Sequence, residues 1–385
     1  MVLLPLLYIG LVAGVGWCVW KWLKVGAFLL EPGGGGRGML VKFSLYAAPI
    51  VGGAIATFFM IKPLLARRAP AAQPLALSPA AEPRLFALVQ GVCDAVGAPF
   101  PNRIDLDCQL NAAASFRRGV WSFVGNDLVL TIGLPLVAGL SVRQFAGVLA
   151  HEFGHFTQGF GLRLTYLIRS VNDWFVRVVY QKDAWDVWLE EWEADSWYVW
   201  FAVVSSKFGV WFSRSLLKIL MRVGFAIGGF MLRQMEYDAD TYEINLAGSE
   251  TFETSTKRMA VLGYANSLCH REMNSSWTSK RLLPDNFPAF LLAQSQVLST
   301  ELQTQIEDAV GLAQTGPFDT HPSSGDRIRQ ARQAGAPGIF GLEGAAWELF
   351  SNFEAVSKQV TYLHYADDLR LDMANTKLAP VQNPK

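Results

Sequence analysis

Two long runs without a charged side chain constrain this chain more than any other feature. Val2 to Trp20 and Phe43 to Ile61 each contain 19 residues, and neither holds Asp, Glu, Lys or Arg. A helical run of this length crosses the ~30 Å hydrocarbon core of a bilayer at about 1.5 Å per residue. A cleaved signal peptide would place basic residues before the apolar run and a small-residue cleavage site after it, which this sequence lacks. We therefore expect a retained transmembrane hairpin over residues 1–66.

The overall composition agrees with a chain that meets a lipid bilayer. Hydrophobic residues make up 51% and charged residues 17%, whereas a soluble domain carries about 25% charged residues. This excludes a disordered chain, which needs low hydrophobicity and high net charge. The net charge is zero, so no broad surface for nucleic acid is indicated. Four cysteines without CxxC spacing suggest neither a disulfide scaffold nor a zinc ribbon.

Changes in composition divide the rest of the chain. Residues 67–83 are rich in Pro and Ala and are expected to form a linker. A folded domain is expected over residues 84–336, including a strand hairpin within 116–132 whose turn is Gly125-Asn126-Asp127. Residues 337–385 are expected to hold a helix at Trp347–Leu363 and a polar tail. The expected fold class is α+β, mostly α, with a small β-sheet.

Residues 163–234 are expected to form an insertion of a different kind. Seven of the 13 Trp lie between Thr165 and Gln234, and the segment 183–195 is acidic. The largely apolar stretch 197–234 is broken by four cations. The pattern leaves two readings open, which are two imperfect transmembrane helices or long amphipathic helices on the bilayer surface. The whole chain would accordingly cross the membrane two or four times.

The pattern His151-Glu152-Phe153-Gly154-His155 is an HExxH motif. On a helix, the two histidines lie one turn apart on the same face and can bind one metal ion, with Glu152 beside them as a general base. Ser141 and Gln144 match a capping box, which predicts that the helix begins there. We expect a catalytic site for one Zn²⁺ ion per chain.

A catalytic zinc ion takes three protein ligands and keeps one position open. The best third ligand downstream is Glu236, in the sequence Glu236-Tyr237-Asp238-Ala239-Asp240. Asp240 follows one helical turn later and is expected to accept the outer N–H of a ligand histidine, His151. Asp238 is expected to point away from the site.

A third element, Thr320-His321-Pro322, precedes Arg327. We expect His321 to donate a hydrogen bond to the oxyanion of a tetrahedral intermediate. Arg327 is expected to orient His321 or to bind the substrate backbone. The competing interpretation is an ordinary turn before a helix.

Together, the sequences HEFGH, EYDAD and THPSSGDRI resemble the zinc metallopeptidases of the HtpX and CAAX prenyl protease family, which are gluzincins. The resemblance covers roughly residues 84–335 and the leading hairpin. It implies zinc bound by His151, His155 and Glu236, Glu152 as general base, and His321 with Arg327 at the substrate side.

The resemblance also implies a function and a location. We expect a membrane-bound zinc endopeptidase that cleaves membrane or misfolded proteins, in a bacterial cytoplasmic membrane with its catalytic domain in the cytoplasm. The peptide substrate would add a strand at the edge formed by Asn111, Ala112 and Ala113, although a plain structural sheet explains that segment equally well. The alternative for the whole chain is a catalytically inactive regulatory or binding protein on a peptidase scaffold.

Overall fold

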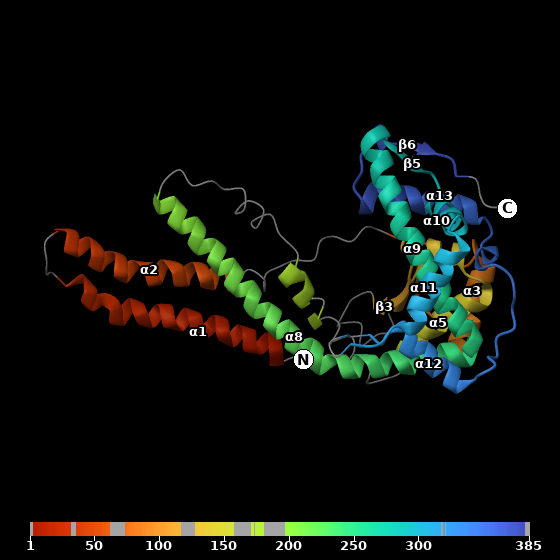
Figure 1. The fold of residues 1–385 in the computed structure, drawn as a ribbon, viewed down its shortest axis with the longest axis horizontal. Coiled ribbons are helices and arrows are strands. Elements are labelled where there is room, and N and C mark those ends of the chain that lie inside the picture. Colours follow the sequence, from red (N-terminus) through yellow and green to blue (C-terminus); the bar gives the residue numbers. More distant parts are fainter. Residues whose placement is uncertain are drawn as a thin grey trace. The chain divides into compact units, whose positions relative to one another are not determined.

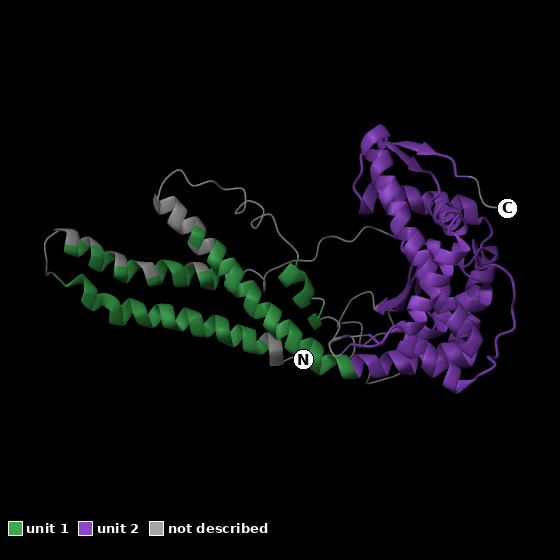
Figure 2. Ribbon diagram, viewed as in Figure 1, with its two compact units in different colours: residues 1–69, 164–230 green, residues 70–163, 231–385 purple. Residues whose placement is uncertain are grey.

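The computed structural model describes residues 3–31, 36–61, 74–116, 128–157, 171–172, 174–180, 197–316, 319 and 321–381. The chain divides into two compact units (Figure 2). Unit 1 contains residues 1–69 and 164–230, and unit 2 contains residues 70–163 and 231–385. The described part of the chain is mostly helical, with a small sheet in unit 2 (Figure 1).

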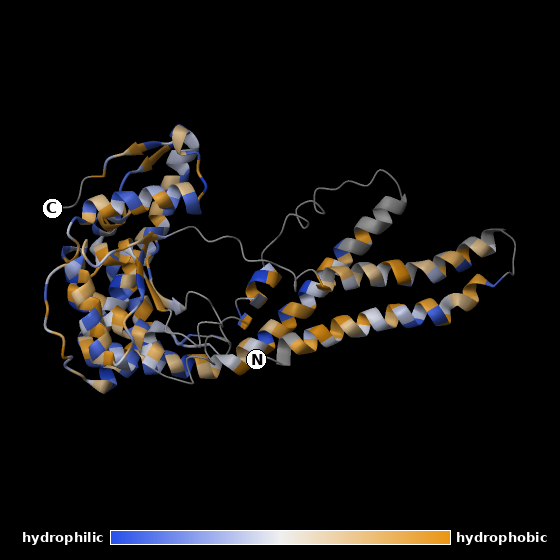
Figure 3. Cartoon of the chain, turned by 180° about the vertical axis from the view of Figure 1, so that it is seen from behind, coloured by the Kyte–Doolittle hydropathy of each residue, from blue (hydrophilic) through white to orange (hydrophobic). Residues whose placement is uncertain are grey.

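Unit 1 is built from long apolar helices. Helix α1 covers Leu3–Val25 and is followed by the short 3₁₀ helix η1, Gly26–Leu30. Helix α2 covers Gly36–Ile61. Hydrophobic residues dominate both long helices, as the orange ribbon in Figure 3 shows. The two uncharged runs of the sequence therefore form two helices.

The stretch 197–234 differs from the expectation. It belongs to one helix, α8, which covers Trp197–Ala247 and contains 51 residues. Among the described residues, three helical stretches are long and apolar enough to cross a membrane, namely Leu6–Leu30, Val41–Phe58 and Lys207–Ala247. Both interpretations of the sequence, two imperfect transmembrane helices or long amphipathic helices on the bilayer surface, named more than one helix, whereas cations within an apolar run do not end a helix. The acidic segment 183–195 lies outside the described residues.

A buried tyrosine hydroxyl joins three helices inside unit 1. The Tyr8 hydroxyl donates a hydrogen bond to the Met60 carbonyl oxygen at 2.9 Å and lies 3.0 Å from Ser213 Oγ. Tyr8 is fully buried, and side chains of the short segment 174–180 pack around it. Because an unpaired hydroxyl is costly in an apolar environment, these contacts satisfy the tyrosine while its ring fills the core.

Unit 2 holds a four-stranded sheet in the order β1-β2-β4-β3. The strands are β1 (Leu75–Ala76), β2 (Arg103–Asp107), β3 (Ala112–Phe116) and β4 (Leu128–Gly133). The edge strand β3 pairs antiparallel with β4, the expected second arm of the hairpin. Apart from Phe116, the expected first arm and the turn lie outside the described residues. The predicted linker is partly wrong, because β1 lies within residues 67–83 and pairs with β2.

The HExxH segment lies on α5, Val142–Thr157. The expected capping box is present, because Ser141 N–H donates to Gln144 Oε1 at 3.0 Å and Gln144 N–H donates to Ser141 Oγ at 3.2 Å. Phe145, Leu149 and Phe153 are fully buried on one face of the helix. The core thus fixes the rotation of α5 and, with it, the direction of the histidines.

Two glycines of α5 let the last turns of α8 approach closely. A Cβ atom added at Gly154 would lie 2.7 Å from Cδ2 of Tyr242, and one added at Gly147 would lie 3.2 Å from Cγ of Glu243. A non-bonded Cβ contact under 3.0 Å essentially never occurs, and one of 3.2 Å is tighter than most. The absence of side chains at these positions therefore brings the carboxylates of α8 within reach of the histidines on α5.

Other helices complete the described part of unit 2. They are α3 (Pro83–Val96), α4 (Leu134–Gly139), α9 (Ser249–Lys280), α10 (Phe287–Gln296), α11 (Thr300–Leu312), α12 (Ser324–Ala334) and α13 (Phe353–Leu363). A small second sheet pairs β5 (Leu282–Pro284) with β6 (Lys377–Ala379).

The region 337–385 belongs to unit 2. The helix expected at Trp347–Leu363 is shorter and is replaced at its start by a 3₁₀ turn, η4, at Ala346–Leu349. Phe350, Val360 and Tyr365 are buried in the main core of the unit. The C-terminal region therefore helps to form the core around the candidate site.

Candidate active site

Helix α5 presents its two histidines on the same face. The ring centroids of His151 and His155 lie 4.9 Å apart, and both residues are buried. This arrangement follows from the four-residue spacing, because side chains at i and i+4 are neighbours on a helix.

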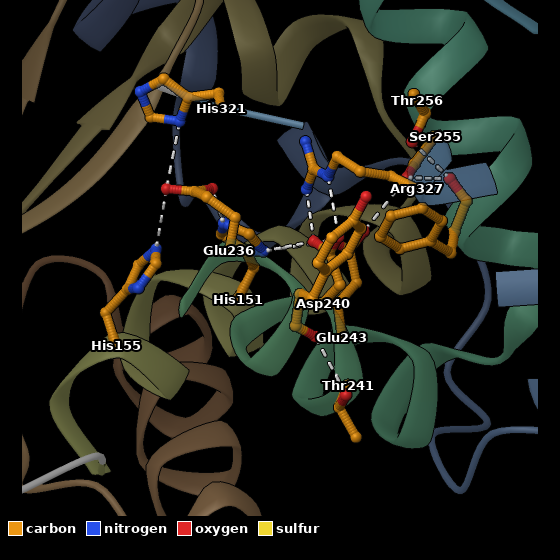
Figure 4. A network of polar contacts seen from close by, with 12 residues as sticks. His151, His155, Glu236, Asp240, Thr241, Glu243, Ser255, Thr256, His321 and Arg327 are labelled. Atoms are coloured by element: carbon orange, nitrogen blue, oxygen red, sulfur yellow. Dashed lines mark hydrogen bonds and ion pairs between the residues drawn. The ribbon is translucent and has the colours of Figure 1, made fainter. Parts of the chain in front are cut away.

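Helix α8 brings a carboxylate against both rings (Figure 4). Glu236 Oε2 lies 3.5 Å from His151 Nε2, and Glu236 Oε1 lies 3.9 Å from His155 Nε2. One ligand atom from each of the three residues lies within 4.8 Å of the other two, and all three residues are buried. Two imidazole nitrogens and one carboxylate oxygen are a donor set that suits a catalytic zinc ion with one open position.

Asp240 lies behind the first histidine. Its Oδ1 is 3.0 Å from His151 Nδ1, which is the contact that the ExxxD spacing predicts. A carboxylate in this position fixes the tautomer and the ring orientation of a ligand histidine. Asp238, by contrast, is exposed and accepts a hydrogen bond from Gln234.

Arg327 of α12 differs from its expected place at the substrate side. Its Nε donates to Asp240 Oδ2 at 2.8 Å, and its terminal nitrogen donates to Oδ1 of the same carboxylate. No local sequence pattern predicts this pair, because the two residues are 87 positions apart. The guanidinium also argues against a second cation at the group His151, Asp240 and Glu243, whose ligand atoms lie equally close together.

The charges of the site are strongly coupled. Burial alone would raise the pKa of Glu236, but hydrogen bonds to His151 and His321 hold it below its ordinary value. Burial alone would lower the pKa of His151, but Asp240 and Glu236 raise it to about 10. The two carboxylates thus favour the protonated form of His151. A histidine binds a metal ion in its neutral form, so metal binding at His151 competes with protonation.

Glu243 is a buried acid of the site that the sequence analysis missed. Its carboxylate accepts a hydrogen bond from Ser255 Oγ at 3.2 Å, and its Oε2 lies 3.9 Å from His151 Nδ1. Burial raises its pKa to about 7. Glu236, Asp240 and Glu243 share one helix face because they are four and three residues apart, and this periodicity could have identified Glu243 from the sequence.

Glu152 faces the edge of the sheet. Its Oε2 accepts a hydrogen bond from the Ala114 N–H of β3 at 3.4 Å, and the residue is half-buried. Within the expected substrate segment, Ala112 is buried opposite Ile132 and Ala113 is half-buried opposite Thr131.

The remaining member of that segment lies at the start of β3. Asn111 is exposed, and its carbonyl oxygen accepts from Gly133 N–H at 2.8 Å. The general base candidate and the edge strand therefore adjoin each other, while Asn111 and Ala112 are held by β4.

His321 reaches the site from a loop. Its side chain is 63% exposed, yet its Nδ1 lies 3.2 Å from Glu236 Oε1. Hydrogen bonds from Ser323 N–H to Thr315 Oγ1 and from Arg233 to the Asp319 carbonyl oxygen hold the loop near α8. The structure thus brings His321 to the carboxylate of the third ligand, and Arg327 pairs with Asp240 rather than with His321.

Comparison with known families agrees with the fold. Residues 79–334 match the model of peptidase family M48, which is more than half of the chain and includes every candidate ligand. The chain therefore belongs to peptidase family M48, and this membership supports a metallopeptidase. The match is to the family as a whole and does not separate HtpX-like from CAAX prenyl protease members. Searches among curated proteins and among solved structures found no significant match.

The buried pair of Arg327 and Asp240 has a measurable consequence for stability. The Asp240 side chain is 1% exposed, so Arg327→Met removes the guanidinium from a buried carboxylate while keeping an unbranched apolar side chain at position 327. We expect the free energy of unfolding to fall by about 3–5 kcal/mol, measured by thermal unfolding. Arg329→Met is the control, because Arg329 is more exposed and pairs with Asp326 on its own helix. Equal unfolding temperatures for the two variants would contradict this account.

Proposed function

We propose that this chain is a membrane-bound, zinc-dependent endopeptidase that hydrolyses peptide bonds of membrane or misfolded proteins. The observation that supports it most directly is the convergence of His151, His155 and Glu236, with Glu152 beside them on α5. A zinc ion, when bound, supplies Lewis acidity and lowers the pKa of water to about 7.

Each residue has a role in this proposal. His151, His155 and Glu236 would hold the metal ion. Glu152 accepts the proton of the attacking water at a carboxylate oxygen and then delivers it to the nitrogen of the leaving amine. Asp240 orients His151, and Arg327 holds Asp240 in place through the guanidinium contact.

The substrate would lie along the edge strand. An extended peptide next to β3 would gain main-chain hydrogen bonds from the strand that contains Ala112 and Ala113. Asn111 would mark one end of this edge. His321, which is exposed close to Glu236, would donate to the oxyanion that develops on the scissile carbonyl.

Membrane attachment is supported by the three candidate apolar helices. Residues 74–157 and 231–381 belong to one folded unit, so both segments lie on one side of a bilayer. An even number of crossings, zero included, must therefore separate them. A bacterial inner membrane with the catalytic unit in the cytoplasm is proposed from the family resemblance.

The alternative of an inactive scaffold is not favoured, because all three candidate ligands and the general base candidate are in place. The direct test measures metal content and proteolysis of the purified full chain with casein as an unfolded substrate. We expect about one zinc ion per chain, loss of cleavage after chelation, and recovery on adding zinc. A metal-free preparation that cleaves casein at the original rate would overturn the proposal.

A further inference from the structure

A segment beyond the family match crosses both helices of the candidate site. We call residues 336–350 the strap, which follows α12 as the blue loop in Figure 1. The matched region ends at residue 334. At the end of α8, the N–H groups of Ile339 and Phe340 both donate to the Leu246 carbonyl oxygen at 2.9 Å. The strap therefore binds one of the terminal carbonyls that a helix cannot satisfy internally.

The same strap then pairs with the start of α5. Val142 N–H donates to the Gly344 carbonyl oxygen at 2.9 Å, and Ala346 N–H donates to the Leu140 carbonyl oxygen at 3.0 Å. Ser141 and Ala345 form an isolated antiparallel bridge between these bonds. A short segment of the strap thus fixes the first turn of the helix that carries both histidines.

Arg143 joins these three elements through one side chain. Its Nε donates to the Ala247 carbonyl oxygen at 2.8 Å, and its Nη2 donates to the Pro337 carbonyl oxygen at 2.9 Å. The guanidinium of α5 therefore caps the end of α8, where a cation is favoured by the helix dipole.

Gly338 brings the strap directly onto the backbone of α8. Its φ is 76°, and a Cβ atom there would lie 2.6 Å from the Ala247 carbonyl carbon and from Gly248 N. No side chain fits at this position without moving the strap away from α8. The glycine at position 338 therefore allows the strap to lie against the backbone of α8.

We infer that the strap and Arg143 are positioning elements, which hold the histidines of α5 and Glu236 of α8 at the separation that zinc requires. Arg143 is eight residues before His151, and Leu246 is ten residues after Glu236, about 12 and 15 Å along their helices. Metal ligands tolerate errors of about 0.2 Å, so a small shift between the two helices weakens binding. This inference rests on the proposed zinc function.

The test compares zinc affinity, by competition with a chelating dye, and the absorption spectrum of the cobalt-substituted full chain. Arg143→Met and Gly338→Val each disturb the strap contacts without touching a ligand. We expect each variant to bind zinc about tenfold or more weakly and to show a changed cobalt spectrum, at temperatures where circular dichroism reports a folded chain. Arg143→Lys should recover part of the affinity, since it restores one donor.

Arg332→Met is the matched control. It removes a two-point arginine contact with Glu253 that joins α12 to α9 and not to α5, so affinity and spectrum should stay unchanged. Zinc affinity and cobalt spectrum equal to wild type in Arg143→Met would overturn the inference, whatever its unfolding temperature. If Gly338→Val does not fold, Arg143→Met and Arg143→Lys decide. Failure of the wild-type chain to bind zinc would instead refute the proposed function.

Discussion

Replacing Glu152 by glutamine is expected to lower kcat/KM for peptide cleavage by about 10²–10⁴-fold, while zinc content and fold stay as in the wild type. Glutamine has the shape of glutamate, and its amide oxygen can still accept the hydrogen bond that Ala114 N–H donates to Glu152. It cannot accept the proton of the attacking water. The change therefore removes the chemical step and leaves the donor set of His151, His155 and Glu236 intact.

The measurement combines steady-state cleavage of a quenched fluorescent peptide with metal analysis of the same sample. Glu272→Gln makes the same chemical change at an exposed position, where the carboxylate contacts Gln294 on the surface, and it should leave the rate unchanged. A Glu152→Gln variant that cleaves at the wild-type rate with its zinc bound would show that another group takes the proton.

Replacing Glu236 by alanine is expected to abolish both zinc binding and cleavage. The Glu236 carboxylate approaches the Nε2 atoms of His151 and His155, at 3.5 and 3.9 Å, and two imidazoles alone do not make a catalytic zinc site. We expect zinc affinity to fall by more than about 100-fold, beyond the effect of removing an outer partner of a ligand. The rate should fall below detection at micromolar zinc.

Asp238→Ala is the matched control for this variant. Asp238 lies on the same helix two residues later, is exposed, and accepts from Gln234. It should keep one zinc ion and full activity. Full zinc occupancy in Glu236→Ala would assign the third ligand to another residue. The pair Glu152→Gln and Glu236→Ala thus separates the chemical step from metal binding.

The parts of the site that the sequence predicted are those fixed by helical periodicity. His151 and His155 are four residues apart, as are Glu236 and Asp240, so each pair shares a face whatever the tertiary structure. Chemistry then supplied the link between the pairs, because zinc needs a third ligand. The apolar helices α1 and α2 were also predictable from local sequence. In a bilayer, a long uncharged run can satisfy its backbone hydrogen bonds within the segment only as a helix.

The parts that could not be predicted depend on contacts between distant segments. Arg327 pairs with Asp240 because α12 packs on α9 and reaches α8, and no local pattern records that packing. The strand β1 has only two residues in a Pro- and Ala-rich segment, too few for a periodicity. The sequence did not predict that α8 is one continuous helix. The order of charged residues along the chain does not by itself show on which side of a helix they lie.

The HExxH notation leaves two positions unspecified, yet in this chain neither is free to vary. Phe153 is fully buried in the main core, and any side chain at Gly154 would collide with the ring of Tyr242, which lies on the same helix as Glu236 and Asp240. A bulkier residue between the histidines would push the helix that supplies the carboxylate outward. Transferring only the two histidines and the glutamate of the motif to another helix would therefore move these side chains without the close helix packing that brings them to the carboxylate of α8.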